Sequence, residues 1–151
     1  MDDREYAGFW IRTGAAVIDS VLILIIIGPV LTAIYGVDYW LSDSAVQGSW
    51  DVLINYILPP IAIVIFWVYK SATPGKMALK LTIVDAKTGG KPSNGQYIGR
   101  YLGYYIAAIP LLLGIIWVGI DKRKQGWHDK MAGTVVIRNN VPEPVRFEGE
   151  R

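Results

Sequence analysis

The stretch WIRTGAAVIDSVLILIIIGPVL, residues 10–31, decides how this chain folds. It belongs to a nearly uninterrupted aliphatic run from Thr13 to Tyr35. At about 1.5 Å per residue, a helix of this length can cross a hydrocarbon core of about 30 Å. Asp19 lies within the run, and Arg12 stands at its start. A charged side chain inside a span costs roughly 2.5–3.5 kcal/mol on insertion scales, so Asp19 is expected to have a polar partner.

The composition is that of a single-domain membrane protein. Hydrophobic residues make up 52% of the 151 residues, and charged residues make up 19%. The chain has no cysteine and one histidine, His128, which excludes disulfides, thiolate metal sites and clusters of histidine ligands. A net charge of +2 is too small to indicate nucleic-acid binding. We expect no cofactor and no bound metal.

A second apolar run, from Val52 to Tyr69, predicts a second transmembrane helix. The connector before it, residues 36–51, contains aspartates but no lysine or arginine, and its aromatic side chains favour the membrane–water interface. The following segment, residues 70–96, carries five lysines and one aspartate. Because basic loops tend to stay in the cytoplasm, this loop and the N-terminus are predicted to be cytoplasmic.

The 70–96 loop also has a pattern typical of β-structure. In LKLTIVDAKTGGK, residues 79–91, apolar and polar residues alternate toward a Gly-Gly turn. This alternation predicts a short strand or a β-hairpin at the membrane surface.

The third apolar segment, residues 97–120, conflicts with the charge rule. If it crossed the membrane once, the basic residues after it would lie outside, although they are as numerous as those of the 70–96 loop. Pro110 lies within this segment, and a proline removes a helical hydrogen bond. We therefore expect the segment to break near Pro110 and to be re-entrant or interfacial, which leaves the C-terminus cytoplasmic. Three ordinary spans are the alternative.

The expected fold is thus an all-α membrane protein with two transmembrane helices, a third apolar segment broken near Pro110 and a short cytoplasmic β-hairpin-like loop. Residues 1–140 are expected to form one transmembrane domain. The proline-bearing, charged residues 141–151 are expected to form a loosely ordered C-terminal tail.

Arg12 and Asp19 are candidate site residues on nearly the same face of the first helix. Seven residues at about 100° each bring them into line, but helical side chains lean toward the N-terminus, so a tight direct ion pair is not expected. They would instead bracket a site. As an alternative, Arg12 extends to lipid headgroups and Asp19 pairs with Arg100 or with neighbouring helices as a structural anchor.

The second informative stretch is DKRKQGWHDKMAGTVVIR, residues 121–138. His128 could titrate near neutral pH, and Asp129 beside it could tune its pKa. Adjacent residues do not normally face each other on a helix, so capping or packing is favoured over a catalytic dyad. Three consecutive basic residues near Trp127 are candidates for contact with lipid headgroups: Lys122, Arg123 and Lys124.

Three segments, taken in order, resemble the RDD family of small prokaryotic membrane proteins. They are AGFWIRTGAAVIDSVLI, SATPGKMALKLTIVDAKTGGKPSNGQYIGRYL and DKRKQGWHDKMAGTVVI, so that the resemblance covers residues 6–138. The arginine and two aspartates of the family name match Arg12, Asp19 and Asp129, with Asp121 as the alternative for the last. Arg100 matches a further basic position. The resemblance implies a multi-pass protein of the prokaryotic inner membrane, and it implies transport, including sodium/proton antiport in some members.

Two functions remain open from the sequence. The first is a homo-oligomeric cation or cation/proton transporter of the sodium/proton type. In it Asp19 would bind the ion, Arg12 would adjust its pKa, and Asp129 with Arg100 would shape a cytoplasmic gate. The second is a non-transporting adaptor or assembly module whose Arg and Asp residues lock the helices. Its basic face would bind anionic lipid or protein. An enzyme is not expected, because the sequence offers no set of nucleophile, base and orienting group.

Overall fold

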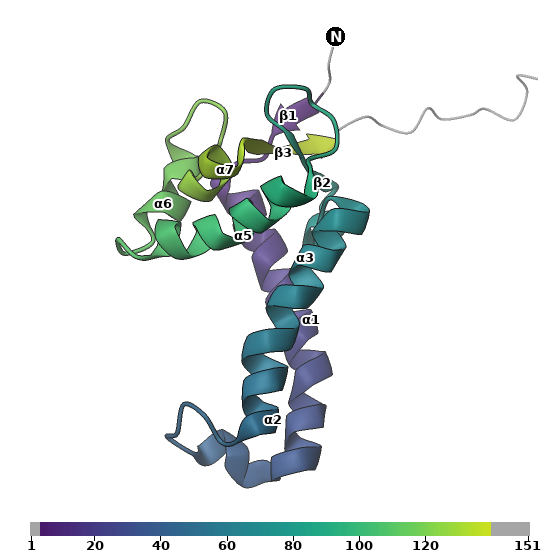
Figure 1. The fold of residues 1–151 in the computed structure, drawn as a ribbon, viewed down its shortest axis with the longest axis vertical. Coiled ribbons are helices and arrows are strands. Elements are labelled where there is room, and N and C mark those ends of the chain that lie inside the picture. The colour runs from purple at the N-terminus through teal and green to yellow at the C-terminus, as the bar shows by residue number, and fades with distance from the viewer. Residues whose placement is uncertain (1–3, 140–151) are drawn as a thin grey trace, which may run out of the picture.

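The structure is a computed structural model that describes residues 4–139, and its main feature is a long pair of helices capped at one end by a smaller assembly (Figure 1). Helix α1 (Phe9–Tyr35) is followed by a 3-10 turn, η1 (Val37–Leu41), and by a continuous helical stretch from Ser49 to Lys70. Both long helices are apolar and long enough to cross a membrane. The two apolar helices predicted from the sequence are therefore present, and both remain candidate spans.

The second long helix contains a π-helical turn. It consists of α2 (Ser49–Val52), η2 (Leu53–Ile57) and α3 (Leu58–Lys70). Pro59 and Pro60 come one residue after η2, and neither can donate a backbone hydrogen bond to the turn before it. The helix widens there, and the amide of Leu58 donates to the carbonyl of Leu53, five residues back. The helix continues through the two prolines without breaking.

The third apolar segment is broken, as its proline predicts. Helix α5 (Asn94–Ala108) ends just before Pro110, and α6 (Leu113–Ile116) with the short turn η3 (Trp117–Gly119) leaves at an angle of 114°. Leu111 and Leu112 have φ angles of 52° and 63°. These left-handed conformations reverse the chain direction, because two such residues cannot belong to a right-handed helix.

Helix α5 is amphipathic and runs across the direction of α1 (Figure 1). One face is buried in the cap and carries Tyr97, Arg100, Gly103 and Ala107. The opposite face exposes a stripe of large apolar side chains, which comprises Ile98, Leu102, Tyr105, Ile106 and Ile109. A helix packed on the protein by one face, with an apolar outer face, is suited to lie where a protein meets lipid.

The cap contains a three-stranded antiparallel sheet, so the expectation of an all-α protein was wrong. Its order is β1 (Arg4–Tyr6), β3 (Thr134–Asn139) and β2 (Leu81–Asp85). The predicted strand in the 70–96 loop is confirmed as β2, but the β-hairpin is not. β2 pairs with β3, which lies about fifty residues further along the chain, with Ile83 opposite Val136. Pairing of that range cannot be read from local alternation.

The hydrophobic core joins this sheet to the helices. Leu81, Ile83 and Val136 of the sheet pack with Trp67 of α3 and Tyr97 of α5. Two short helices complete the cap, α4 (Pro74–Ala78) after α3 and α7 (Trp127–Ala132) before β3. The predicted tail of residues 141–151 lies outside the described residues.

Candidate functional site

The centre of the cap is an ion cluster around Asp129 of α7. Both terminal nitrogens of Arg12 donate to its Oδ2 at 2.8 Å, and Nη1 of Arg100 donates to its Oδ1. The amide of Gly126 also donates to Oδ2, at 3.0 Å, which caps the start of α7. Burial raises the pKa of the Asp129 carboxyl, but the two guanidinium groups outweigh it and hold that pKa below its usual range.

Arg100 is fully buried and contacts several groups besides Asp129. Its Nη1 donates to the hydroxyl of Thr134 at 2.8 Å. Its guanidinium lies 5.4 Å from the ring centroid of Trp67 and 5.8 Å from that of Tyr104, within cation–π range. Within residues 4–139, its Nε and Nη2 have no hydrogen-bond partner. The cluster thus connects α1, α3, α5, α7 and β3.

The cluster depends on a close approach of α5 and α7. A Cβ atom on Gly103 of α5 would lie 2.9 Å from the Cα of His128, so a larger residue would separate the two helices. The His128 ring stacks on Tyr104 with 3.9 Å between ring centroids. Burial lowers the pKa of His128 to about 3 despite the Asp129 charge. The expectation that His128 titrates near neutral pH was therefore wrong, because the ring is almost inaccessible to water.

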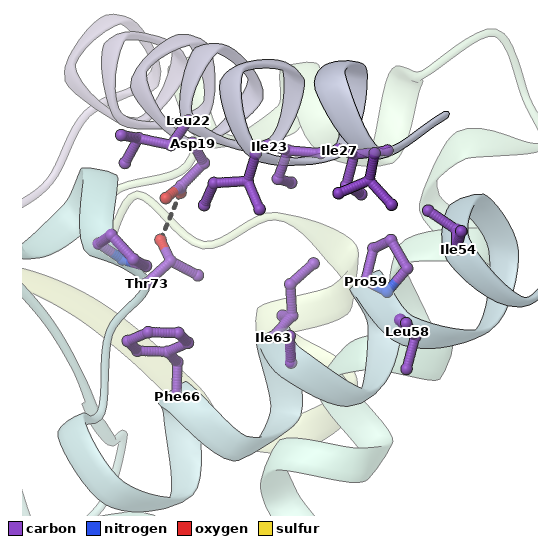
Figure 2. Close-up of a pocket in the computed structure, with 14 residues that line it drawn as sticks. Asp19, Leu22, Ile23, Ile27, Ile54, Leu58, Pro59, Ile63, Phe66 and Thr73 are labelled. Carbon is purple, nitrogen blue, oxygen red and sulfur yellow. Dashed lines mark hydrogen bonds between the residues drawn. The ribbon is translucent and has the colours of Figure 1, made fainter. Parts of the chain in front are cut away.

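Asp19 lies outside this cluster and caps a different helix. Its carboxylate accepts a hydrogen bond of 2.5 Å from the Thr73 hydroxyl (Figure 2) and one of 2.7 Å from the amide of Gly75. These residues form the start of α4. The alternative in which Asp19 pairs with Arg100 was wrong, since Arg100 bonds to Asp129. The expectation that Asp19 and Arg12 form no tight pair is confirmed by their separate partners.

The contact between Asp19 and α4 requires a glycine. A Cβ atom on Gly75 would lie 2.1 Å from the carbonyl oxygen of Ala15 and 2.9 Å from Cγ of Asp19. Only a residue without a side chain lets α4 approach the backbone of α1 this closely. Thr73-Pro74-Gly75 therefore acts as a docking segment for the first transmembrane helix.

Two cavities flank Asp19. One, called the polar cavity for the charged and polar side chains in its otherwise largely apolar wall, has a volume of about 450 Å³ and lies between α1, α3, α5 and α7. Arg12, Lys76, Tyr104 and His128 are among its lining residues. An apolar one of about 460 Å³ lies between α1 and α3, and Figure 2 shows its aliphatic walls with Asp19 and Thr73 at one end. Within the described part of the chain, no group of three or more His, Asp or Glu residues could hold a metal ion.

The three basic residues at 122–124 differ in the contacts that they make with the rest of the protein. Arg123 is committed to the protein, because it donates to the carbonyl of Ala86 at 2.6 Å and to the Tyr6 hydroxyl at 3.4 Å. Asp121, the alternative match to the family's second aspartate, pairs with Lys130 at 2.8 Å on the surface. The lysines at 122 and 124 have no comparable contacts in the described chain.

Sequence reasoning missed two polar groups. Lys76 was noted only as part of a basic loop, yet its side chain is buried in the polar cavity wall. At the other end of the helical pair, Asp51 is buried and accepts from the Tyr39 hydroxyl at 2.6 Å and from the Gln47 amide at 2.7 Å. Asn55 also donates to Asp51. The i, i+4 spacing of Asp51 and Asn55 on one helix face is the signal that could have revealed this group.

Comparisons with known proteins give the same family that the motifs indicate. The model of the RDD family matches residues 6–133. An uncharacterized protein of Rickettsia prowazekii is 43% identical over 74 residues, which are 49% of this chain and 40% of that relative. This chain thus covers less than half of that protein's length.

Two relatives in Bacillus subtilis align over most of the chain. The uncharacterized protein YxaI is 30% identical over 87% of this chain and 96% of the relative. The uncharacterized membrane protein YteJ is 28% identical over 91% of this chain and 84% of the relative. No solved structure matches the chain.

Proposed function

Because this chain belongs to the RDD family and is a membrane protein, we propose that it is a membrane-embedded assembly module whose Arg and Asp residues hold its helices together. One observation carries the proposal: both acidic side chains of the family pattern are occupied by protein donors. Asp129 binds two guanidinium groups, and Asp19 binds a hydroxyl and an amide at the start of α4. A carboxylate that carries an ion through a membrane must exchange such partners during each cycle.

The proposed partners are anionic lipids. In this proposal the exposed Lys122 and the partly buried Lys124 contact lipid headgroups, whereas Arg123 keeps its contacts with Ala86 and Tyr6. The apolar stripe on α5 would lie in the adjoining lipid. Self-association would use the exposed apolar faces of the two long helices, and size-exclusion chromatography with light scattering measures it directly. No catalytic role is proposed.

We place the protein in the prokaryotic cell membrane with the N-terminus, the 70–96 loop and the C-terminus in the cytoplasm. The lysine content of the loop supports this orientation. The shared sheet supports it as well, because β1, β2 and β3 come from these three parts of the chain and pair side by side. Single cysteines introduced at Ser44, Thr88 and Asn139 test it. Ser44 is expected to react with an impermeant reagent from outside and the other two only from inside, and external labelling of Asn139 would contradict the proposal.

Transport of cations, with or without proton exchange, is the second candidate. One observation favours it: Asp19 is only partly buried and lines both cavities. In that case Asp19 would release Thr73 and Gly75 when an ion binds, and Arg12 with Arg100 and Asp129 would form the gate.

Reconstitution into liposomes separates the two functions. Vesicles that contain a pH-sensitive dye are given sodium, lithium or potassium gradients, with wild type, Asp19→Asn and no protein compared in parallel. The assembly module predicts equal fluxes in all three, together with a lower stability of the variant in detergent. A flux in the wild type that a folded Asp19→Asn variant lacks would establish transport and overturn the leading proposal.

A further inference from the structure

Lys76 is a buried cation without a counterion. Lys76 lies in α4, and the residue is 8% exposed. Its ammonium lies 5.6 Å from the ring centroid of Trp67. Among residues 4–139, no carboxylate forms an ion pair with it. Burial lowers the pKa of the Lys76 ammonium. A charge in such a place is stabilised by a negative partner.

The polar cavity and the adjoining ion cluster around Asp129, taken together, carry a surplus of positive charge. Arg12 and Arg100 share one carboxylate, Asp129, and the acid that lines the cavity itself, the partly buried Asp19, already accepts two hydrogen bonds within the described structure. His128 remains neutral because of its low pKa. Three cations therefore face two carboxylates, and Lys76 is the one left over.

Several polar atoms of residues in the cavity wall also lack partners. The Nε of Arg12 and both ring nitrogens of His128 are buried and form no hydrogen bond within the described chain. Both residues line the same polar cavity as Lys76, whereas the hydroxyl groups of Thr13 and Ser20 in its wall donate to carbonyl groups of their own helix. A cavity with an ammonium group that forms no ion pair with a carboxylate of the described residues suits an oxyanion such as a phosphate or a carboxylate.

The polar cavity continues into the apolar groove between α1 and α3. Four residues line both: Asp19, Ile23, Ile63 and Thr73. Beyond them the groove is walled by aliphatic and aromatic side chains of the two long helices, as Figure 2 shows. One molecule could thus place an anionic end near Lys76 and an apolar chain along the helices.

We propose that these joined cavities bind one anionic lipid, with its headgroup phosphate or carboxylate against Lys76 and one acyl chain between α1 and α3. The charge near Lys76 selects an anion, and the adjoining groove selects an amphiphile over a soluble anion. This site is separate from the surface lysines at 122 and 124, and it does not rest on the assembly role proposed above.

Native mass spectrometry of the detergent-purified full chain tests the site. The protein is mixed with equal amounts of phosphatidylglycerol and phosphatidylcholine of identical acyl chains, and the bound fraction of each is measured. The wild type is expected to prefer the anionic lipid by at least about fivefold, the effect of one lysine at a membrane surface. Lys76→Gln is expected to bind both lipids equally, whereas Lys76→Arg and the surface control Lys122→Gln keep the preference.

Two further experiments test whether the bound molecule is a lipid. Ala62→Phe fills the apolar groove, whose wall includes Ala62, and is expected to reduce binding of both lipids while Lys76 remains. Inorganic phosphate added in excess is expected to displace little lipid, and full displacement would point to a soluble anion and overturn the proposal. Equal binding of the two lipids by wild type would also overturn it, as would a preference lost in Lys122→Gln but kept in Lys76→Gln. If Lys76→Gln does not fold, the binding of both lipids by Ala62→Phe is compared with binding by wild type. Undiminished binding by Ala62→Phe would then overturn the proposal.

Discussion

Arg12 and Asp129 stand 117 positions apart in the chain, yet they meet through two hydrogen bonds of 2.8 Å. One belongs to the first transmembrane helix and the other to the last short helix of the cap. With Arg100 on its other oxygen, Asp129 is the carboxylate shared by two cations. The stability of the cap therefore depends on this carboxylate.

Asp129→Asn should destabilise the protein strongly. It removes the negative charge from between two buried guanidinium groups, and breaking a buried ion pair by removal of one partner costs about 3–5 kcal/mol. Unfolding in detergent, followed by tryptophan fluorescence, gives the change in free energy. The matched control is Asp121→Asn, whose exposed pair with Lys130 is expected to contribute about 0–1 kcal/mol. Similar losses in both variants would contradict a structural role for the cluster.

Asp19→Ala should loosen α4 without unfolding the rest of the protein. The Thr73 hydroxyl and the Gly75 amide lose their acceptor, and each buried donor left without a partner costs about 1–3 kcal/mol. Hydrogen exchange is expected to accelerate at residues 73–76, while exchange in β3 stays slow. Unchanged exchange at Gly75 would show that its amide is not held by Asp19.

Gly75→Ala should separate α4 from α1. The added methyl group would lie 2.1 Å from the carbonyl oxygen of Ala15, a distance at which the backbone has to move. Thermal unfolding in detergent should therefore occur at a lower temperature. The control is Gly99→Ala, since a Cβ there meets nothing within 4 Å and alanine favours the helix by up to about 1 kcal/mol. If Gly99→Ala were destabilised and Gly75→Ala were not, the close contact of α4 with α1 at Gly75 would be contradicted.

Stability should fall as the pH drops from about 7 toward 4, and His128 should be a main cause. Its folded pKa of about 3 lies below the unfolded value of 6.5, so between these values the unfolded chain binds the extra proton. The stabilisation is fully present above pH 6.5 and is lost as the pH falls, with a slope of up to about 1.4 kcal/mol per pH unit. Asp129, whose pKa is lowered, stays ionised in this range.

His128→Phe provides the comparison for that pH dependence. Phenylalanine can stack on Tyr104 but does not titrate, so the slope between pH 4 and 7 should decrease. The melting temperature as a function of pH, in one detergent and one salt concentration, measures it. Parallel curves for variant and wild type would assign the acid sensitivity to other groups.

Much of the fold could be predicted from composition and spacing. Long apolar runs indicate spans because the membrane thickness sets their length, and this identified both long helices. The break before Pro110 followed from the chemistry of proline and the placement of positive charge. These signals are local or depend on simple counts, so one sequence is enough to read them.

The partners of the charged residues were harder to predict from the sequence than the positions of the helices. Arg12, Asp19, Arg100 and Asp129 were all candidates, but the sequence does not say which arginine meets which aspartate. That choice depends on how α5 and α7 pack around Gly103 and how α4 reaches α1 through Gly75. The same applies to β2, whose alternation indicates a strand but does not identify β3 as its neighbour. Lys76 was overlooked because burial of a lysine in a basic loop leaves no pattern in the sequence.

The pairing of β3 with β1 and of Asp129 with Arg12 has a consequence for biosynthesis. On the ribosome, both long helices are complete and can enter the bilayer before α7 and β3 have been translated. During that interval Arg12 has no carboxylate from the cap, and β1 has no strand beside it. Insertion and cap assembly are therefore separate events in time, and the nascent chain is most exposed to chaperones and proteases between them.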